Sequence, residues 1–171
     1  MKNFKILICG DIKVGKSTLI EKLIAELSEK PKGYITVRLP AREEKSRVYL
    51  YDIANPPECV EDAEVIMDFT GESVKKFPEK LDTTGVSYLE NISAGSLVVL
   101  DEIGTLESKA PKFQQAVMDI LSGPYRVLAS VKAQNTEFLR AVRAHEDCEL
   151  YIITPGNRDE LFRQLCKEIS E

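Results

Sequence analysis

The segment from residue 10 to residue 17 has the spacing of a phosphate-binding loop. It reads Gly-Asp-Ile-Lys-Val-Gly-Lys-Ser and fits the pattern G-x-x-x-x-G-K-[ST]. Glycines let such a loop wrap closely around a diphosphate, with successive N–H groups pointing inward. Lys16 would reach the β- and γ-phosphates, and the Ser17 hydroxyl would ligate Mg²⁺. The predicted nucleotide contacts in this segment are Gly10, Asp11, Ile12, Lys13, Val14, Gly15, Lys16, Ser17 and Thr18.

The surroundings of this segment argue against the alternative, a chance match. A compact apolar strand signal at 4–9 precedes the loop, and apolar residues at helical spacing follow it from Ser17 onward. A helix that begins at the loop adds its N–H groups and the positive end of its dipole. Asp11 is unusual because a carboxylate repels phosphate, so we expect it to point into solvent. Lys13 is interpreted as a solvated surface residue.

A second group of candidate residues follows the apolar run at 97–100. This run is typical of a central parallel strand covered on both faces, and Asp101 follows at its C-terminal end, the edge where ligands bind in such sheets. We predict that Asp101, with Ser17, holds Mg²⁺, the carboxylate acting through the waters of the ion. Glu102 is the candidate to orient or deprotonate the attacking water, so Lys16 and Glu102 are the predicted catalytic residues. The alternative for Glu102 is an ordinary charged residue at a strand end.

Two later segments are expected to reach the same edge of the sheet. Ser130 ends a predicted strand and Lys132 follows closely, so either could sense the γ-phosphate or simply be a polar strand terminus. After the last predicted strand, Asn157 and Arg158 could contact the base. Asn157, with Glu160 three residues later, also has the spacing of a helix-capping box, and both interpretations can hold together.

Composition limits the classes of protein to which the chain can belong. Of its 171 residues, 43% are hydrophobic and 30% are charged, a balance typical of a globular protein. The net charge of −5 disfavours general binding to nucleic acid or to an anionic membrane, and no run is long enough for a signal peptide or membrane span. The four cysteines lack C-x-x-C spacing and there is one histidine, which argues against a structural zinc site. We therefore expect a cytoplasmic protein in a reducing compartment.

The order of the predicted elements indicates the fold class. Strands are expected at 34–39 and 47–53, which form a hairpin with a polar turn at 40–45. Further strands are expected at 97–100, 127–131 and 150–153. The stretch 55–81 is weakly patterned and contains one candidate strand, at 65–69. Helices are expected from Ser17 to near Lys30 and at 82–92, 113–121, 137–143 and 161–169. This alternation predicts an α/β fold, a mostly parallel sheet with helices on both faces. With no repeat or linker, one domain spanning residues 1–171 is the simplest organisation.

The order of motifs resembles that of the THEP1-type nucleoside-triphosphatases. The resemblance rests on 10–19, on LVVLDEIGTLE at 97–107, and on Asn157-Arg158 before the last helix; the pattern D-E-I-G-x-x-E is its most specific part. Gly33-Tyr34 with Thr36, followed by Arg47, is similar to the Gly-Phe-x-Thr stretch and arginine-bearing hairpin of the family. The resemblance implies a P-loop NTPase fold of the RecA/AAA-like kind, with a β-hairpin excursion after the first helix. It also implies slow hydrolysis of several nucleoside triphosphates to diphosphate and phosphate.

Some positions depart from the family pattern. Asp-Ile-Lys at 11–13 replaces the usual Pro-Pro-Gly, Val-Arg at 37–38 replaces acidic residues, and Thr105 replaces a lysine. Nucleotide binding is still expected despite the changes in the loop. The changes near Thr36 and at Thr105 are expected to affect turnover and substrate range. Glu107, in the same telling pattern, is interpreted as an acidic residue that begins the following helix and favours its dipole.

Three functions are compatible with these residues. The leading hypothesis is Mg²⁺-dependent hydrolysis of nucleoside triphosphates, ATP and GTP among them. We expect loose base selection, because the chain has no Asn-Lys-x-Asp motif. A phosphotransferase would use Glu102 to activate a hydroxyl acceptor instead of water, with residues 55–81 as an acceptor site or lid. A nucleotide-binding switch would change the conformation of the hairpin with little turnover.

Overall fold

The structure is a computed structural model that describes residues 4–40 and 45–170. These residues form an eight-stranded sheet in the order β5-β4-β3-β2-β6-β7-β1-β8. The strands are β1 (Lys5–Gly10), β2 (Lys32–Pro40), β3 (Lys45–Asp52), β4 (Glu64–Thr70), β5 (Ser73–Lys76), β6 (Leu97–Ile103), β7 (Arg126–Lys132) and β8 (Glu149–Ile152). The α-helices are α1 (Lys16–Glu26), α2 (Pro78–Lys80), α3 (Pro111–Ser122), α4 (Glu137–Arg143) and α5 (Arg158–Ser170). Shorter helical turns are η1 (Val60–Asp62), the π-helical η2 (Leu81–Gly85) and η3 (Leu106–Lys109).

Strands β2, β6, β7, β1 and β8 run parallel. β7 lies between β1, which leads into the phosphate loop, and β6, which carries Asp101. The carboxyl ends of these strands therefore meet at one edge of the sheet, as predicted. This arrangement confirms the expected α/β fold with a mostly parallel sheet.

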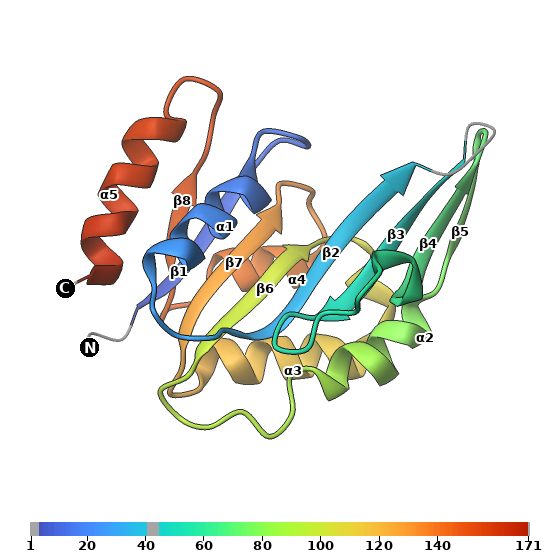
Figure 1. The fold of residues 1–171 in the computed structure, drawn as a ribbon, viewed down its shortest axis with the longest axis horizontal. Coiled ribbons are helices and arrows are strands. Elements are labelled where there is room, and N and C mark those ends of the chain that lie inside the picture. The colour runs from blue at the N-terminus through green and yellow to red at the C-terminus, as the bar shows by residue number, and fades with distance from the viewer. Residues whose placement is uncertain (1–3, 41–44, 171) are drawn as a thin grey trace.

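Helices cover both faces of the parallel part of the sheet, α1 and α5 on one face and α3 and α4 on the other (Figure 1). Successive side chains of β1 alternate between two apolar clusters. Ile6 and Ile8 pack with α1 and α5, whereas Leu7 packs in the cluster that includes α3 and α4. Both faces of the strand are thus buried, which explains its continuous apolar run.

The predicted hairpin is the beginning of an antiparallel extension, in which β2, β3, β4 and β5 pair in sequence order and reach away from α5 (Figure 1). Most of its predicted turn, residues 41–44, lies outside the described residues. The candidate strand at 65–69 is confirmed as β4. β5 was not predicted because its sequence, Ser-Val-Lys-Lys, is exposed throughout and has no apolar face to read.

Two helix predictions were wrong at their ends. α1 ends at Glu26 rather than near Lys30, because Leu27 already adopts extended angles and the chain turns back toward β2. The helix expected at 82–92 begins earlier, at Pro78, a residue suited to a first helical turn. It continues through η2 and ends by Ser87, before the predicted boundary.

Candidate functional site

The phosphate loop connects β1 to α1 in the conformation that its glycines predict. Lys13 and Gly15 have left-handed backbone angles, with φ of 62° and 103°. A loop in which the sign of φ alternates from residue to residue forms a concave nest of N–H groups. Gly15, the residue before α1, makes no side-chain cap on the helix, so no capping side chain competes with a ligand for the first N–H groups of α1. The loop therefore has the geometry of an anion-binding site.

Lys16 reaches back over this loop. Its Nζ donates hydrogen bonds to the backbone oxygens of Gly10, at 2.9 Å, and Asp11, at 2.8 Å. Burial lowers the pKa of the ammonium group below its usual value, and the nearby Glu102 partly offsets this effect. Lys16 is thus a cation held at the loop by weak carbonyl acceptors, which a phosphate oxygen could replace.

Asp101 joins the loop to β6 and β7. Its Oδ1 accepts hydrogen bonds of 2.9 Å from both the Ser17 and Ser130 hydroxyls. The side chain is 1% exposed, and this burial raises its pKa. The two predicted metal-site residues, Ser17 and Asp101, are therefore in direct contact. Ser130 orients Asp101 and also accepts the Glu102 backbone N–H at 2.6 Å.

β6 contains a bulge at this point. Asp101 and Glu102 together stand opposite the single residue Ser130, because Leu100 pairs with Ala129 and Ile103 with Val131. Glu102 adopts φ of 66°, an uncommon angle for a residue with a side chain. The bulge returns Ile103 to the same apolar cluster as Leu100. Both acidic residues thus lie within β6, not after its end as predicted.

Glu102 is held by two partners. Its Oε1 lies 3.0 Å from Lys132 Nζ, and its Oε2 accepts a 3.3 Å hydrogen bond from the Thr36 hydroxyl at the start of the antiparallel extension. Glu102 lines a hollow of about 220 Å³ with six other residues: Lys13, Gly15, Lys16, Ser17, Thr18 and Ser130. We call this space the phosphate hollow. It brings the predicted catalytic pair, Lys16 and Glu102, to one place.

A second hollow of about 230 Å³ shares Gly15 and Thr18 with the phosphate hollow. We call it the base hollow. Arg158 lies over Gly15, with its Nε 3.6 Å from where a Cβ of that residue would be. The other lining residues are Leu19, Lys22, Ile153, Asp159 and Phe162. Lys22 and Phe162 were not predicted from the sequence. Lys22 lies four residues after the predicted contact Thr18, and Phe162 lies four residues after Arg158. This spacing places each of them on the same helix face as a predicted contact.

Several predicted contacts do not line either hollow. Asp11 is exposed, as expected, and Ile12 is exposed beside it, whereas Val14 is buried in the apolar core. Asn157 differs more clearly from the prediction of base contact. Its amide oxygen accepts the Thr154 N–H at 2.8 Å and its amide nitrogen donates to the Ile152 carbonyl at 2.9 Å. The side chain therefore stabilises its own loop and positions Arg158.

Glu107 occupies an unexpected position. It does not begin α3 but lies in η3, where its side chain is buried against the sheet. Burial raises the pKa of this carboxyl to about 7, although the Glu107 and Gly104 backbone N–H groups bond to it. Its Oε2 and the hydroxyl of Tyr34, also buried, have no hydrogen-bond partner among the described residues. Glu107 is thus a sealed carboxyl close to, but outside, the phosphate hollow.

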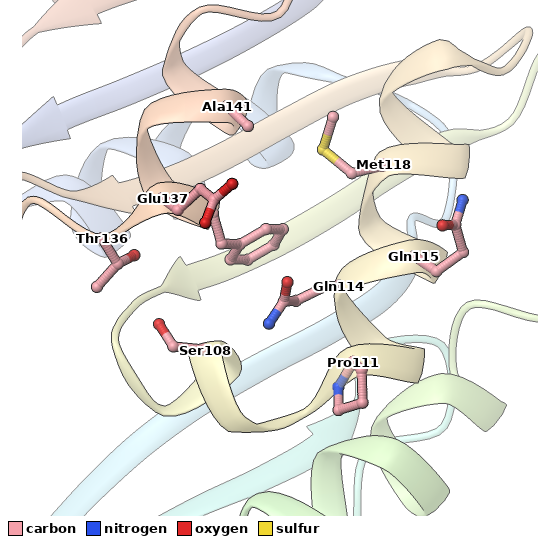
Figure 2. A pocket seen from close by; sticks show the side chains of 9 residues that line it. Ser108, Pro111, Gln114, Gln115, Met118, Thr136, Glu137 and Ala141 are labelled. Carbon is pink, nitrogen blue, oxygen red and sulfur yellow. The ribbon is translucent and has the colours of Figure 1, made fainter.

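A hollow of about 530 Å³ lies elsewhere, between α3, α4 and η3 (Figure 2). Its lining includes polar side chains such as Gln114 and Thr136 as well as Phe138 and Met118, and none of the lining residues belongs to the phosphate loop. In residues 4–40 and 45–170, no group of three or more His, Cys, Asp or Glu side chains is arranged to hold a metal ion. Within the same ranges, no helix has the length and apolar character needed to cross a membrane.

The sheet order and the loop define a P-loop NTPase, and comparisons with known proteins agree. A family model described as NTPase matches residues 5–166, so the chain belongs to this NTPase family. The nucleoside-triphosphatase THEP1 of Thermotoga petrophila is 28% identical over 164 residues, which cover 94% of this chain and 90% of that protein. THEP1 of Thermofilum pendens is 37% identical over 95 residues, spanning 54% of this chain and about half, 52%, of that protein.

The crystal structure of THEP1 from Aquifex aeolicus has a similar fold. It superposes with a TM-score of 0.73 and 22% sequence identity, covering 95% of this chain and 96% of that one. The resemblance to THEP1-type proteins inferred from the D-E-I-G-x-x-E pattern is thereby confirmed for the fold and the family.

Proposed function

We propose that this chain hydrolyses nucleoside triphosphates, ATP and GTP among them, to nucleoside diphosphate and phosphate with Mg²⁺. The observation that carries the proposal is the contact between Ser17 Oγ and Asp101 Oδ1, at 2.9 Å, beside a hollow that Lys16 and Glu102 share. Phosphoryl transfer requires a phosphate cradle, a metal site and a group that handles the attacking water. The residues that would form these three parts, Ser17 with Asp101, Lys16, and Glu102, lie together at one sheet edge.

The oxygen donors at the site fit Mg²⁺. This hard cation prefers oxygen ligands and usually keeps several waters, with only one or two protein groups. Ser17 would supply a hydroxyl ligand and Asp101 a carboxylate that accepts from metal-bound water. Bound Mg²⁺ would supply positive charge that offsets the negative charge of the triphosphate during transfer.

The protein residues have distinct tasks in the proposed reaction. Lys16 and the loop N–H groups bind the β- and γ-phosphates, and Glu102 accepts a proton from the attacking water. The water oxygen forms a bond to the γ-phosphorus as the bond to the β–γ bridging oxygen breaks. The electron pair of that bond leaves with the diphosphate, and the proton passes from Glu102 to the product phosphate or to solvent.

The base hollow supports broad base selection. Arg158 presents a planar cation and Phe162 an aromatic ring, two surfaces on which any base can stack. Asn157, the more selective hydrogen-bonding residue of the pair, is occupied within its loop. We therefore propose that Arg158 contacts the base without discriminating strongly between purines and pyrimidines.

The test is phosphate release from ATP, GTP, CTP and UTP with Mg²⁺ and no added acceptor, with EDTA as the metal-free control. Hydrolysis predicts release from several triphosphates that stops with EDTA. Release only after a hydroxyl compound is added would indicate the phosphotransferase instead. Tight binding without release would indicate a nucleotide switch.

A further inference from the structure

Lys132 is not among the residues that line the phosphate hollow, but it pairs with one that is, Glu102, and it has no task in the reaction described above. It is the last residue of β7 and the register partner of Gly10, where the phosphate loop begins. Its backbone carbonyl accepts a 2.8 Å hydrogen bond from Arg143, which fixes this end of the strand. Its ammonium group lies 3.0 Å from Glu102 Oε1, and its side chain is 23% exposed. A partly exposed cation is therefore paired with the proposed base.

Gly104 makes room for this side chain. A Cβ on Gly104 would lie 3.0 Å from Lys132 Cδ and 3.3 Å from its Cε, closer than ordinary carbon contacts. The aliphatic stem of Lys132 thus crosses the turn after β6 directly over the glycine, and this path directs the ammonium group to Glu102. The glycine of the D-E-I-G pattern thus leaves room for this path, which a Cβ would displace by a few tenths of an ångström.

Two ammonium groups, those of Lys16 and Lys132, bind protein oxygens beside the phosphate hollow. Lys16 donates to the backbone oxygens of Gly10 and Asp11, and Lys132 pairs with Glu102. Both cations thus bind protein oxygens at positions from which a polyphosphate could compete for them.

We propose that Lys132 exchanges Glu102 for the γ-phosphate when a nucleoside triphosphate binds, an exchange that presupposes the hydrolysis proposed above. A partly exposed Lys–Glu pair is only weakly stabilising. A terminal phosphate offers the same ammonium more charge and more acceptor oxygens. When Lys132 leaves, Glu102 Oε1 is free to accept a proton from water, while the Thr36 hydroxyl keeps Oε2 in place.

The exchange makes the base available only when a hydrolysable phosphate is present. A diphosphate has no γ-phosphate, so the ion pair between Lys132 and Glu102 stays intact when a diphosphate binds. Lys132 is then both a binding residue for the γ-phosphate and the residue that pairs with Glu102 until a triphosphate binds. The affinity difference between triphosphate and diphosphate should therefore depend on Lys132.

The test compares Lys132→Met with the parent, since methionine keeps an unbranched stem to cross Gly104 but carries no charge. Calorimetry with Mg²⁺ would measure binding of a non-hydrolysable ATP analogue and of ADP. We expect Lys132→Met to bind the analogue about tenfold or more weakly, the loss of one charge-assisted hydrogen bond, and ADP within about twofold of the parent. Lys109→Met, at an exposed lysine of η3, is the matched control and should leave both affinities unchanged.

The outcomes separate this inference from the function on which it rests. A parent protein that binds neither nucleotide and releases no phosphate would overturn the proposed function. If the parent hydrolyses ATP but Lys132→Met keeps the parental ratio of the two affinities, the exchange is wrong and the function stands. An equal loss for the analogue and ADP would also overturn it, because it would indicate a general change in the site.

Discussion

The two glutamates of the D-E-I-G-x-x-E pattern lie near one another but have very different surroundings. Glu102 lies in the phosphate hollow, where its carboxylate contacts Lys132 and Thr36 and remains within reach of solvent. Glu107 is sealed at 5% exposure beneath the same edge, next to the side of the sheet covered by α3 and α4. The two carboxyl groups are five residues apart in the sequence. That of Glu102 can exchange its partners, whereas that of Glu107 is enclosed.

The difference indicates that burial, not residue type, separates the roles of the two carboxyls. A carboxylate with weak, partly solvated partners can change them when a ligand arrives. A fully buried carboxyl pays a desolvation penalty when charged, so it favours the neutral form and stays in place. We therefore expect changes around the phosphate hollow to alter nucleotide chemistry, and changes at Glu107 to alter stability.

The largest effect is expected at the phosphate loop. Lys16→Ala should abolish detectable binding of nucleoside triphosphates while the protein remains folded, because the hydrogen bonds of the ammonium group are made to carbonyl oxygens of the phosphate loop itself. Calorimetry with ATP and thermal unfolding measure the two properties. Lys30→Ala, at an exposed lysine beyond α1, is the control. Unchanged ATP affinity in a folded Lys16→Ala variant would contradict the phosphate-site assignment.

Glu102→Gln should slow turnover strongly and leave ATP binding near that of the parent. Glutamine keeps the size of the side chain and one acceptor oxygen but cannot take a proton from water. General-base assistance is worth about 10²- to 10⁴-fold in rate. Single-turnover rates on Glu102→Gln and Glu107→Gln test the comparison directly. A nearly normal rate for the first with an inactive second variant would reverse the roles that we assign.

Asp101→Asn should raise the Mg²⁺ concentration needed for half-maximal turnover. The neutral amide holds a hydrated cation less well, and loss of an outer-sphere partner typically costs about 10- to 100-fold in metal affinity. A magnesium titration of the hydrolysis rate measures the shift, with Asp62→Asn at an exposed carboxylate as the control. Overlaying titrations for parent and variant would exclude Asp101 from the metal site.

The smallest effect on catalysis, and the clearest on stability, is expected for Glu107→Gln. The pKa of Glu107 is raised from 4.5 to about 7 in the folded protein, so the folded state binds more protons than the unfolded state between these pH values. The free energy of unfolding therefore falls as pH rises through this window, by about 3 kcal/mol in total, and is flat above it. Glutamine resembles the neutral carboxyl and should remove this part of the slope.

Urea unfolding at pH 5 and pH 8 measures this slope. Glu107→Gln should gain stability relative to the parent at pH 8 and much less at pH 5, with turnover within a few-fold of the parent. Glu90→Gln, at an exposed glutamate, should follow the parent at both pH values. Burial also raises the pKa of Asp101, so this residue contributes a pH dependence of the free energy of unfolding that is the same in the parent and in both variants. Parallel pH dependence in Glu107→Gln and the parent would show that Glu107 is ionised in both states.

Local patterns in the sequence were enough to predict the parts of the site that depend on neighbours along the chain. The phosphate loop follows from the spacing of Gly10, Gly15 and Lys16 between a strand and a helix, because loop conformation and helix dipole act over a few residues. The apolar run before Asp101 likewise predicts a buried parallel strand. Strands alternating with helices were sufficient for the α/β fold and for placing both groups at one sheet edge.

Only the tertiary structure decided how these groups meet. The bulge that turns Glu102 toward the loop requires the pairing of β6 with β7, and its contacts with Thr36 and Lys132 join residues 66 and 30 positions apart. The burial of Glu107 depends on how η3 and Tyr34 pack against the sheet. Hydrogen bonds, ion pairs and desolvation act through space, so residues distant in the chain determine which carboxylate faces the hollow and which is enclosed.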